Sequence, residues 1–289
     1  MQFNLSPAEG ERRDLYADLA VTAREFLAEG GVRNVFFMHK EPGLRVRFQL
    51  SQARAEAARE ALGRRVSRLP GLRAAPVGAV YEPESYLFGG PGSMPFAHDL
   101  FTLDSLAWLD HHVDTADADA DADADIGTAP VAGWRWSLLV LREMFAGLGI
   151  AGWEHRGVWE TVRSDTGRRL GGQQVADARV QRAAEGIRAQ WVMPRAQALA
   201  VFPVERAGAL VRHLDAVGEA ARRWRTGWFE AGAAAERPVP LGPRQAVAYV
   251  TVFHWNRGLV SWARQSLIAE ALVAEGSRDA ARIRVGRGR

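Results

Sequence analysis

The sequence predicts an α+β fold in which a mainly antiparallel sheet is flanked by helices. Two β-rich runs, VRNVFFMHK and LRVRFQL, are separated only by the turn-forming EPG, which is typical of an antiparallel hairpin. Segments with apolar residues at helical spacing precede and follow these runs. Because helices and strands alternate irregularly, the pattern indicates a sheet with helices packed on one side.

The first predicted helix covers residues 11–29 and stops at a Gly-Gly pair. The hairpin follows, and strict alternation in its second strand sets Arg45 and Arg47 on one face. Ser51 is the expected N-cap of a second helix, SQARAEAAREALGRRVSRL. The run RAAPVGAVYEP is then predicted to form another strand.

The second half of the chain is expected to be mostly helical. In the loop FGGPGSMP, Gly89 and Gly90 indicate a tight turn, because no GxGxxG or Walker pattern surrounds them. Helices are predicted for FAHDLFTLDSLAWLDHH, WRWSLLVLREMFAGLG, VERAGALVRHLDAVGEAARRWRTGWFEAG and GLVSWARQSLIAEALVAEG. RQAVAYVTVFHWN is predicted to be a final strand that presents His254 at its end.

The domain organisation expected is one domain over residues 1–289. Residues 114–130, DTADADADADADIGTAP, are too polar to bury apolar surface and are predicted to form a disordered acidic loop. The alternating aspartates could suggest a calcium site, but the run lacks the turn glycine and the distal glutamate of a calcium loop. Residues 277–289 are expected to be a flexible tail.

Composition excludes several classes of chemistry. The chain has no cysteine, so disulfides, thiolate zinc sites and cysteine nucleophiles are ruled out. Its net charge of +3 is dispersed, which gives no indication of direct nucleic-acid binding. No apolar run reaches the roughly 20 residues of a membrane helix, and no signal peptide is recognisable. A cytoplasmic protein without a membrane partner is expected.

Two groups of polar residues are candidates for chemistry. Arg45 and Arg47 could grip a carboxylate with their forked donors, or form a solvated sheet face. His254, Asn256 and Arg257 follow an apolar run, where a histidine held by a partner can transfer protons. A structural histidine, with Asn256 as a turn residue or cap, is the alternative.

Other constellations are weaker. Glu82 and Glu84 are predicted on the same strand face. No metal is expected, because His98, His111 and His112 occur without an HExxH motif. The chain has no GxSxG motif, so the sequence gives no indication of a serine hydrolase.

Four segments, in order along the chain, carry a family resemblance. VFFMHKEPGLRVRFQL is similar to an aromatic strand, a D/E-P turn and an HLRLRF strand, and VYEPESYLFGGPGSMPFAHDLFTLDS to a Y-x-x-E…YGG…M…A…LF..DS block. GLGIAGWEHRGVW resembles a mid-domain element and FHWNRGL an H-x-N-R segment. Over residues 30–275 the chain thus resembles the thiopeptide-type bacteriocin biosynthesis family, which includes the C-terminal elimination domains of lantibiotic dehydratases and their freestanding, split versions.

The resemblance implies the elimination-domain fold and a metal- and cofactor-independent carbon–oxygen lyase. Such a lyase removes glutamate from glutamylated Ser or Thr of a ribosomally made precursor peptide, which leaves dehydroalanine or dehydrobutyrine. The implied partners are the precursor peptide, with leader and glutamylated core, and a separate tRNA-dependent glutamylating protein. The sequence leaves both a monomer and a homodimer open.

The resemblance also implies roles for individual residues. His254 would handle the proton, and Arg45 and Arg47 would bind the glutamyl group. The remaining substrate contacts would come from Asn256, Arg257, Tyr81 and Glu84.

Three positions depart from the family pattern. Lantibiotic members commonly have arginines where this chain has Pro83 and Leu87, and many have histidine in place of Gly43. Two alternatives therefore stand beside glutamate elimination. One is a pyridine synthase that joins two dehydroalanines in a formal [4+2] cycloaddition with release of the leader peptide. The other is a non-catalytic scaffold that binds the leader peptide by strand addition.

Overall fold

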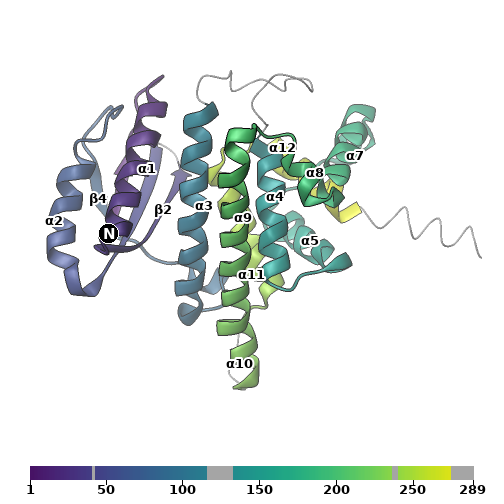
Figure 1. Cartoon of the computed structure of the whole chain (residues 1–289). Helices are drawn as coiled ribbons and strands as arrows, with labels where there is room; N and C mark the ends of the chain where they lie inside the picture. The colour runs from purple at the N-terminus through teal and green to yellow at the C-terminus, as the bar shows by residue number, and fades with distance from the viewer. Residues whose placement is uncertain (41–42, 116–132, 236–239, 275–289) are drawn as a thin grey trace, which may run out of the picture. The chain divides into compact units, whose positions relative to one another are not determined.

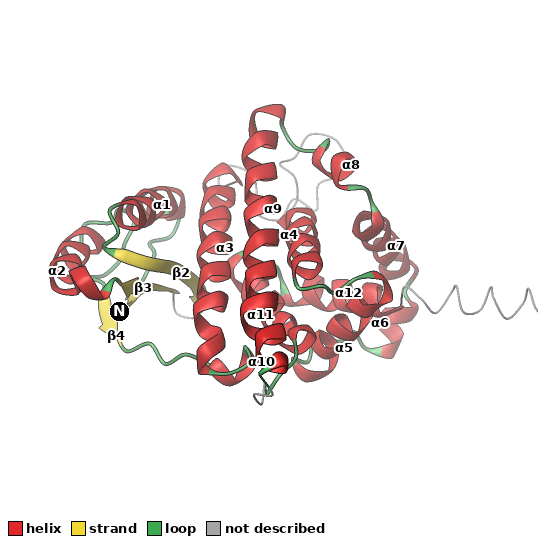
Figure 2. Cartoon of the chain, turned by 60° about the horizontal axis from the view of Figure 1, so that its bottom comes forward, coloured by secondary structure: helices red, strands yellow, loops and turns green. Residues whose placement is uncertain are grey.

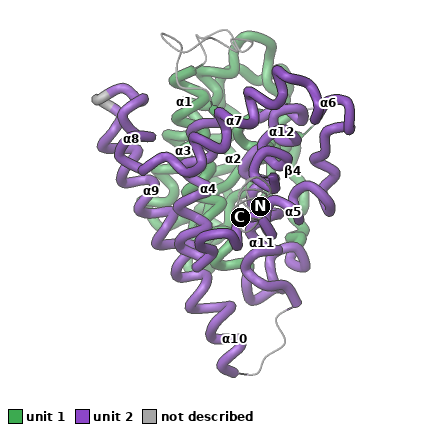
Figure 3. The backbone as a smooth tube through the Cα atoms, turned by 90° about the vertical axis from the view of Figure 1, so that its right-hand side faces the viewer, with its two compact units in different colours: residues 1–84, 94–133, 256–259 green, residues 85–93, 134–255, 260–289 purple. Residues whose placement is uncertain are grey.

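The computed structural model describes residues 1–40, 43–115, 133–235 and 240–274, within which the chain forms two compact units (Figure 3). Unit 1 comprises residues 1–84, 94–133 and 256–259, and unit 2 comprises residues 85–93, 134–255 and 260–289. Residues 41 and 42 of the predicted EPG turn, most of the acidic run 114–130 and the tail 277–289 lie outside the described residues.

Unit 1 contains a four-stranded antiparallel sheet, which confirms the predicted α+β class and the predicted hairpin. Its strands lie in the order β2-β3-β1-β4. Strand β1 was not predicted. It precedes the first helix and lies between β3 and β4 in the sheet. The strands are β1 (Gln2–Leu5), β2 (Val32–Lys40), β3 (Gly43–Leu50) and β4 (Val77–Ala79).

The two faces of this sheet differ in character. One face carries the buried core side chains Phe3, Leu5, Leu44, Val46 and Phe48. The helices α1 (Arg12–Ala28) and α2 (Ala55–Val66) lie on the same side of the sheet (Figures 1 and 2). The opposite face carries the arginines of β3, as the alternation predicts. The third helix of unit 1, α3 (Met94–Thr115), packs against β2.

Unit 2 is helical throughout its described part (Figures 2 and 3). Stacked and edge-on indole rings of Trp159, Trp191 and Trp255 form much of its core, with centroid distances of 5.3 and 6.0 Å. Short 3₁₀ turns cover Ser85–Leu87, Pro91–Ser93 and Gly152–Glu154. The helices are α4 (Gly133–Gly147, whose first residue belongs to unit 1), α5 (His155–Asp165), α6 (Gly172–Ala176), α7 (Ala178–Val192), α8 (Arg195–Leu199), α9 (Val204–Trp224) with its π-helical extension Arg225–Glu230, α10 (Ala231–Ala234), α11 (Pro243–Arg257) and α12 (Trp262–Val273).

The predicted final strand RQAVAYVTVFHWN is wrong, because this run forms α11. Its β-branched and aromatic residues favour a strand, but an apolar run buried on several sides can equally be a core helix. Pro243 occupies the first helical position, where the missing N–H costs nothing. The Thr251 hydroxyl donates to the Val247 carbonyl one turn earlier, which adapts this β-branched residue to a helix. His254 therefore lies in a helix.

Smaller differences concern element ends. The strand predicted from RAAPVGAVYEP is only three residues long, so Glu82 and Glu84 are exposed in the segment after β4 and share no strand face. Ser51 precedes a 3₁₀ turn and makes no side-chain capping hydrogen bond. The tight turn at Gly89 and Gly90 is confirmed, because their φ angles are +93° and +100°, in a region that favours glycine.

Candidate functional site

Arg47 is the best-oriented cation on the polar face of the sheet in unit 1. Its Nε donates to Gln2 Oε1 at 2.8 Å. The guanidinium carbon lies 4.6 Å from the centroid of the Tyr81 ring and 5.7 Å from that of Phe36. Burial lowers the pKa of Arg47, whereas electrostatic interactions with Tyr81 and Glu84 raise it. The guanidinium stays protonated and is held flat between a hydrogen-bond acceptor and aromatic rings.

Tyr81 packs against Arg47 and also contacts His98. Its hydroxyl lies 3.1 Å from His98 Nε2, and the His98 ring stacks on Phe36 at 4.9 Å. Burial raises the pKa of Tyr81 to about 12 and lowers the pKa of His98 to about 4. Both groups are therefore neutral near pH 7. With His98 protonated on Nδ1, the Tyr81 hydroxyl donates to Nε2.

Arg257 belongs to the same unit and is completely buried. Its Nη1 lies 2.8 Å from Asp104 Oδ2, and its Nε donates to the Phe37 carbonyl at 3.0 Å. The guanidinium carbon is 4.5 Å from the centroid of Phe101. Within the described part of the chain, Nη2 has no hydrogen-bond partner. Arg257 thus anchors the structure. Burial is the main cause of the lowered pKa of Arg47, and the nearby positive charge of Arg257 lowers it further.

The remaining predicted residues of unit 1 are less constrained. Arg45 lies on the face that carries Arg47 and is partly exposed. Glu84 is exposed. Asn256 is near the end of α11, where its backbone carbonyl accepts a hydrogen bond from His39 Nδ1 at 3.0 Å.

The sequence analysis did not single out His39, and it considered His112 only as a metal ligand. His112 Nε2 lies 2.7 Å from the Arg257 carbonyl, so two histidines hold successive carbonyls at the end of α11. His39 Nε2 lies 2.8 Å from the Tyr16 hydroxyl. Burial, followed by the nearby His112, lowers the pKa of His39 to about 4. The motif FMHKEPG contains His39, but its backbone partner Asn256 is 217 residues away in sequence.

His254 lies in unit 2, whereas the arginines of β3 lie in unit 1. Its side chain is fully buried on α11. Its Nε2 lies 2.9 Å from Ser137 Oγ, and Trp255 Nε1 donates to the same hydroxyl at 3.0 Å. The described structure therefore brings Arg47, Tyr81 and Arg257 together within unit 1 and gives His254 a serine partner within unit 2.

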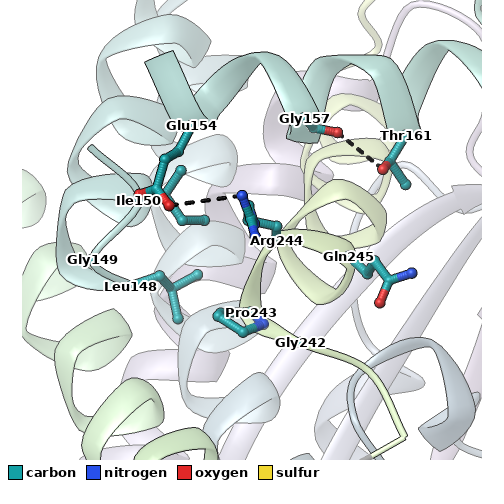
Figure 4. A pocket seen from close by; sticks show the side chains of 10 residues that line it. All are labelled: Leu148, Gly149, Ile150, Glu154, Gly157, Thr161, Gly242, Pro243, Arg244 and Gln245. Carbon is teal, nitrogen blue, oxygen red and sulfur yellow. Dashed lines mark hydrogen bonds and ion pairs between the residues drawn. The ribbon is translucent and has the colours of Figure 1, made fainter. Parts of the chain in front are cut away.

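Unit 2 also contains a surface pocket with a volume of about 450 Å³ (Figure 4). Arg244 points toward Glu154 across it, with a distance of 3.7 Å between Nη1 and Oε1. None of the residues predicted to take part in chemistry lines this pocket. Its lining is Leu148, Gly149, Ile150, Glu154, Gly157, Thr161, Gly242, Pro243, Arg244 and Gln245.

Comparison with known proteins relates this geometry to a family. Residues 5–275 match the family described as lantibiotic biosynthesis dehydratase C-term. The chain belongs to this family. The family resemblance expected from the sequence is thereby confirmed, and the family places this chain among proteins of lantibiotic biosynthesis.

Solved structures share the fold of this lantibiotic dehydratase C-terminal chain. The tRNA dependent lantibiotic dehydratase MibB from Microbispora sp. 107891 matches with a TM-score of 0.64 and 17% identity, over 98% of this chain and 28% of MibB. TsrL matches with a TM-score of 0.52 and 16% identity, over 98% of this chain and 97% of TsrL. The chain thus spans little more than a quarter of MibB. A search of curated proteins gives no significant match.

Two further findings concern only the described residues of this lantibiotic dehydratase C-terminal chain. No helix among them is long and apolar enough to cross a membrane. No group of three or more His, Cys, Asp or Glu side chains among them could hold a metal ion.

Proposed function

We propose that this chain eliminates glutamate from glutamylated Ser or Thr residues of a ribosomally synthesised precursor peptide. The product would be dehydroalanine or dehydrobutyrine. Support comes from the family and from the cationic cluster of unit 1, which consists of Arg45, Arg47 and Arg257. A separate tRNA-dependent protein would attach the glutamyl group, and the precursor peptide would present both its leader and its glutamylated core.

The single observation that carries the proposal is the environment of Arg47. Gln2 engages only its Nε, and the Tyr81 ring supports one face of the guanidinium. Within the described residues, no hydrogen bond is made by Nη1 or Nη2, so these donors are available to a carboxylate. A pre-oriented guanidinium fork with free donors is suited to the carboxylates of a glutamyl group.

The reaction is a β-elimination. A base takes the α-proton, the electrons of the C–H bond form the Cα=Cβ double bond, and the Cβ–O ester bond breaks. Glutamate leaves with both electrons of that bond as a carboxylate. We assign binding of the leaving glutamyl group to Arg45 and Arg47, because cationic donors stabilise the developing negative charge.

His254 is assigned to the proton transfer, with Ser137 holding its ring through Nε2. Tyr81 is assigned to substrate binding because its ring supports Arg47. Glu84 is assigned to the same role at the exposed side of the cluster, and Arg257 to the buried side. Asn256 would contact the peptide from the end of α11. The reaction needs no metal or cofactor.

Substitution of the arginines tests the proposal. A serine peptide that carries a glutamyl ester is incubated with the protein, and loss of glutamate is followed by mass spectrometry. We expect Arg47→Ala to lower kcat/KM by about 10²-fold, since one donor to the developing charge is removed. Arg64→Ala, which removes an exposed arginine from α2, is the matched control and should leave kcat/KM unchanged. Equal rates for the two variants would exclude Arg47 from the reaction.

A second candidate function is the [4+2] cycloaddition of two dehydroalanines with release of the leader peptide. The observation that favours it is Leu87, a half-buried residue of a 3₁₀ turn in unit 2 that stands where lantibiotic members commonly have arginine. A site with fewer cations is less suited to hold a glutamyl carboxylate. This candidate predicts turnover of a peptide that already carries both dehydroalanines.

A further inference from the structure

The two edges of the sheet in unit 1 are treated differently. The outward backbone groups of β2 are bound by side chains: Val35 N–H donates to Thr102 Oγ1 and Phe37 N–H donates to Ser105 Oγ, both at 3.2 Å. The outward carbonyl of Phe37 accepts from Arg257 Nε at 3.0 Å. Helix α3 and Arg257 therefore close this edge, which is a common way to prevent pairing with another strand.

The opposite edge, formed by β4, is open among the described residues. The sheet order ends at β4, and no described strand pairs with its outer side. Val77 is 62% exposed and Val80 is 83% exposed, although both are apolar. Gly78 between them is also exposed, and a Cβ added there would meet no atom within 4 Å. An exposed strand edge with apolar side chains is a template for another strand.

The register identifies the backbone groups that point outward from β4. Met1 and Phe48 exchange two backbone hydrogen bonds, at 2.9 and 3.0 Å, so alternate residues of β1 bond to β3 from Met1 onward. Gln2 and Asn4 therefore direct their N–H and C=O groups toward β4, where they face Ala79 and Val77. The N–H and C=O of Gly78 consequently point away from the sheet.

This edge is continuous with the arginine face. Residues that lie opposite each other in neighbouring strands share a face, so Val77 lies in line with Asn4 and Arg45, and Ala79 with Gln2 and Arg47. Two residues after β4, the Tyr81 ring packs under the Arg47 guanidinium at 4.6 Å.

We propose that the β4 edge binds an extended segment of the peptide substrate by strand addition, through the outward N–H and C=O of Gly78. This inference rests on the proposed function, since it names how the peptide of that reaction is held. Strand addition takes affinity from main-chain hydrogen bonds and specificity from alternate side chains. Val77 and Val80 offer contacts to apolar residues, and the exposed Arg73 just before β4 favours an acidic one.

The geometry separates the bound segment from the reacting residue. Neighbouring strands lie about 4.8 Å apart, so three strand spacings place an added strand roughly 14 Å from β3. An extended chain covers about 3.3 Å per residue, so the glutamylated residue would follow or precede the bound segment by about four residues. Substrates shortened to the reacting residue would lose this contact but keep the chemistry.

A pair of variants at one position tests the inference. Gly78→Pro removes the outward N–H while the hydrogen bonds between β4 and β1 remain, and Gly78→Ala keeps that N–H. The probes are N-acetyl O-glutamyl-serine amide and a peptide in which the same residue is extended on both sides by about eight alternating valine and glutamate residues. We expect Gly78→Pro to raise KM for the long peptide by about tenfold with kcat unchanged. Gly78→Ala should behave as the wild type, and the short probe should not distinguish the three proteins. Equal KM values for the long peptide in all three would overturn the inference.

Hydrogen exchange separates this result from the proposed function. On the wild-type protein, saturating long peptide should slow exchange of the Gly78 amide, whether or not glutamate is eliminated. Slowed exchange without turnover would support the edge and refute the lyase. Turnover of the long peptide with unchanged exchange at Gly78 would support the lyase and refute the edge.

Discussion

Two arginine–carboxylate pairs in unit 1 have similar geometry and opposite surroundings. Arg257 lies 2.8 Å from Asp104 with both side chains at or below 3% exposure, and Arg24 lies 2.7 Å from Asp110 with both half exposed. Removing one partner of a buried pair leaves an uncompensated charge in the interior. An exposed pair is already compensated by water.

We therefore expect Arg257→Ala to lower the free energy of unfolding by roughly 3–5 kcal/mol. Arg24→Ala is the control and should cost about 0–1 kcal/mol. Urea denaturation of both variants measures the difference. Similar losses in the two variants would show that Arg257 is not a structural anchor.

Residue patterns along the chain predicted part of this site. Alternation in LRVRF places Arg45 and Arg47 on one face, because a strand has a period of two. The partners of Arg257 could not be predicted in the same way, since Asp104 is 153 residues and Phe37 is 220 residues distant. His98 was considered only as a metal ligand, whereas its contact with Tyr81 depends on how α3 packs on the sheet.

At the scale of elements, two histidines contact the last backbone carbonyls of α11. His39 and His112 contact the carbonyls of Asn256 and Arg257, which have no intrahelical partners at a helix end. Because burial and then the neighbouring His112 lower the pKa of His39 to about 4, this arrangement uses a neutral His39 imidazole near pH 7.

The contacts of His39 and His112 with the end of α11, which we call the histidine clamp, predict that the stability of the protein depends on pH. The pKa of His39 is about 4 in the folded protein and 6.5 ordinarily, so the unfolded chain binds more protons between these values. The contribution is complete above pH 6.5 and is lost as the pH falls toward 4. His39→Asn keeps a donor for the Asn256 carbonyl but does not titrate, so the free energy of unfolding should fall less steeply below pH 6.5. Urea denaturation across this range measures the slope, and an unchanged slope in the variant would contradict the clamp.

The elements themselves were predictable to different degrees. The hairpin and α1 have strong local signals in turn residues and apolar spacing. The run that forms α11 does not, because buried helices and buried strands share the same apolar composition. The short β1 was missed because its pairing partners in β3 lie more than 35 residues away.

At the scale of the whole molecule, the family match and the fold comparison agree. The fold extends over 98% of this chain in both MibB and TsrL, yet identity is only 17% and 16%. At such identity the two comparisons show the common architecture alone, because one fold can carry different sites. The division into two units, with arginines in one and His254 in the other, was not predictable from local sequence patterns.

The most direct measurement is mass spectrometry of two peptides incubated separately with the purified wild-type protein. One peptide carries a glutamyl ester on serine, and the other already carries two dehydroalanines and a leader. Glutamate elimination predicts that the first peptide loses glutamate and gains one dehydroalanine, while the second is unchanged. An unchanged first peptide, together with cyclisation and leader release from the second, would contradict the proposed lyase.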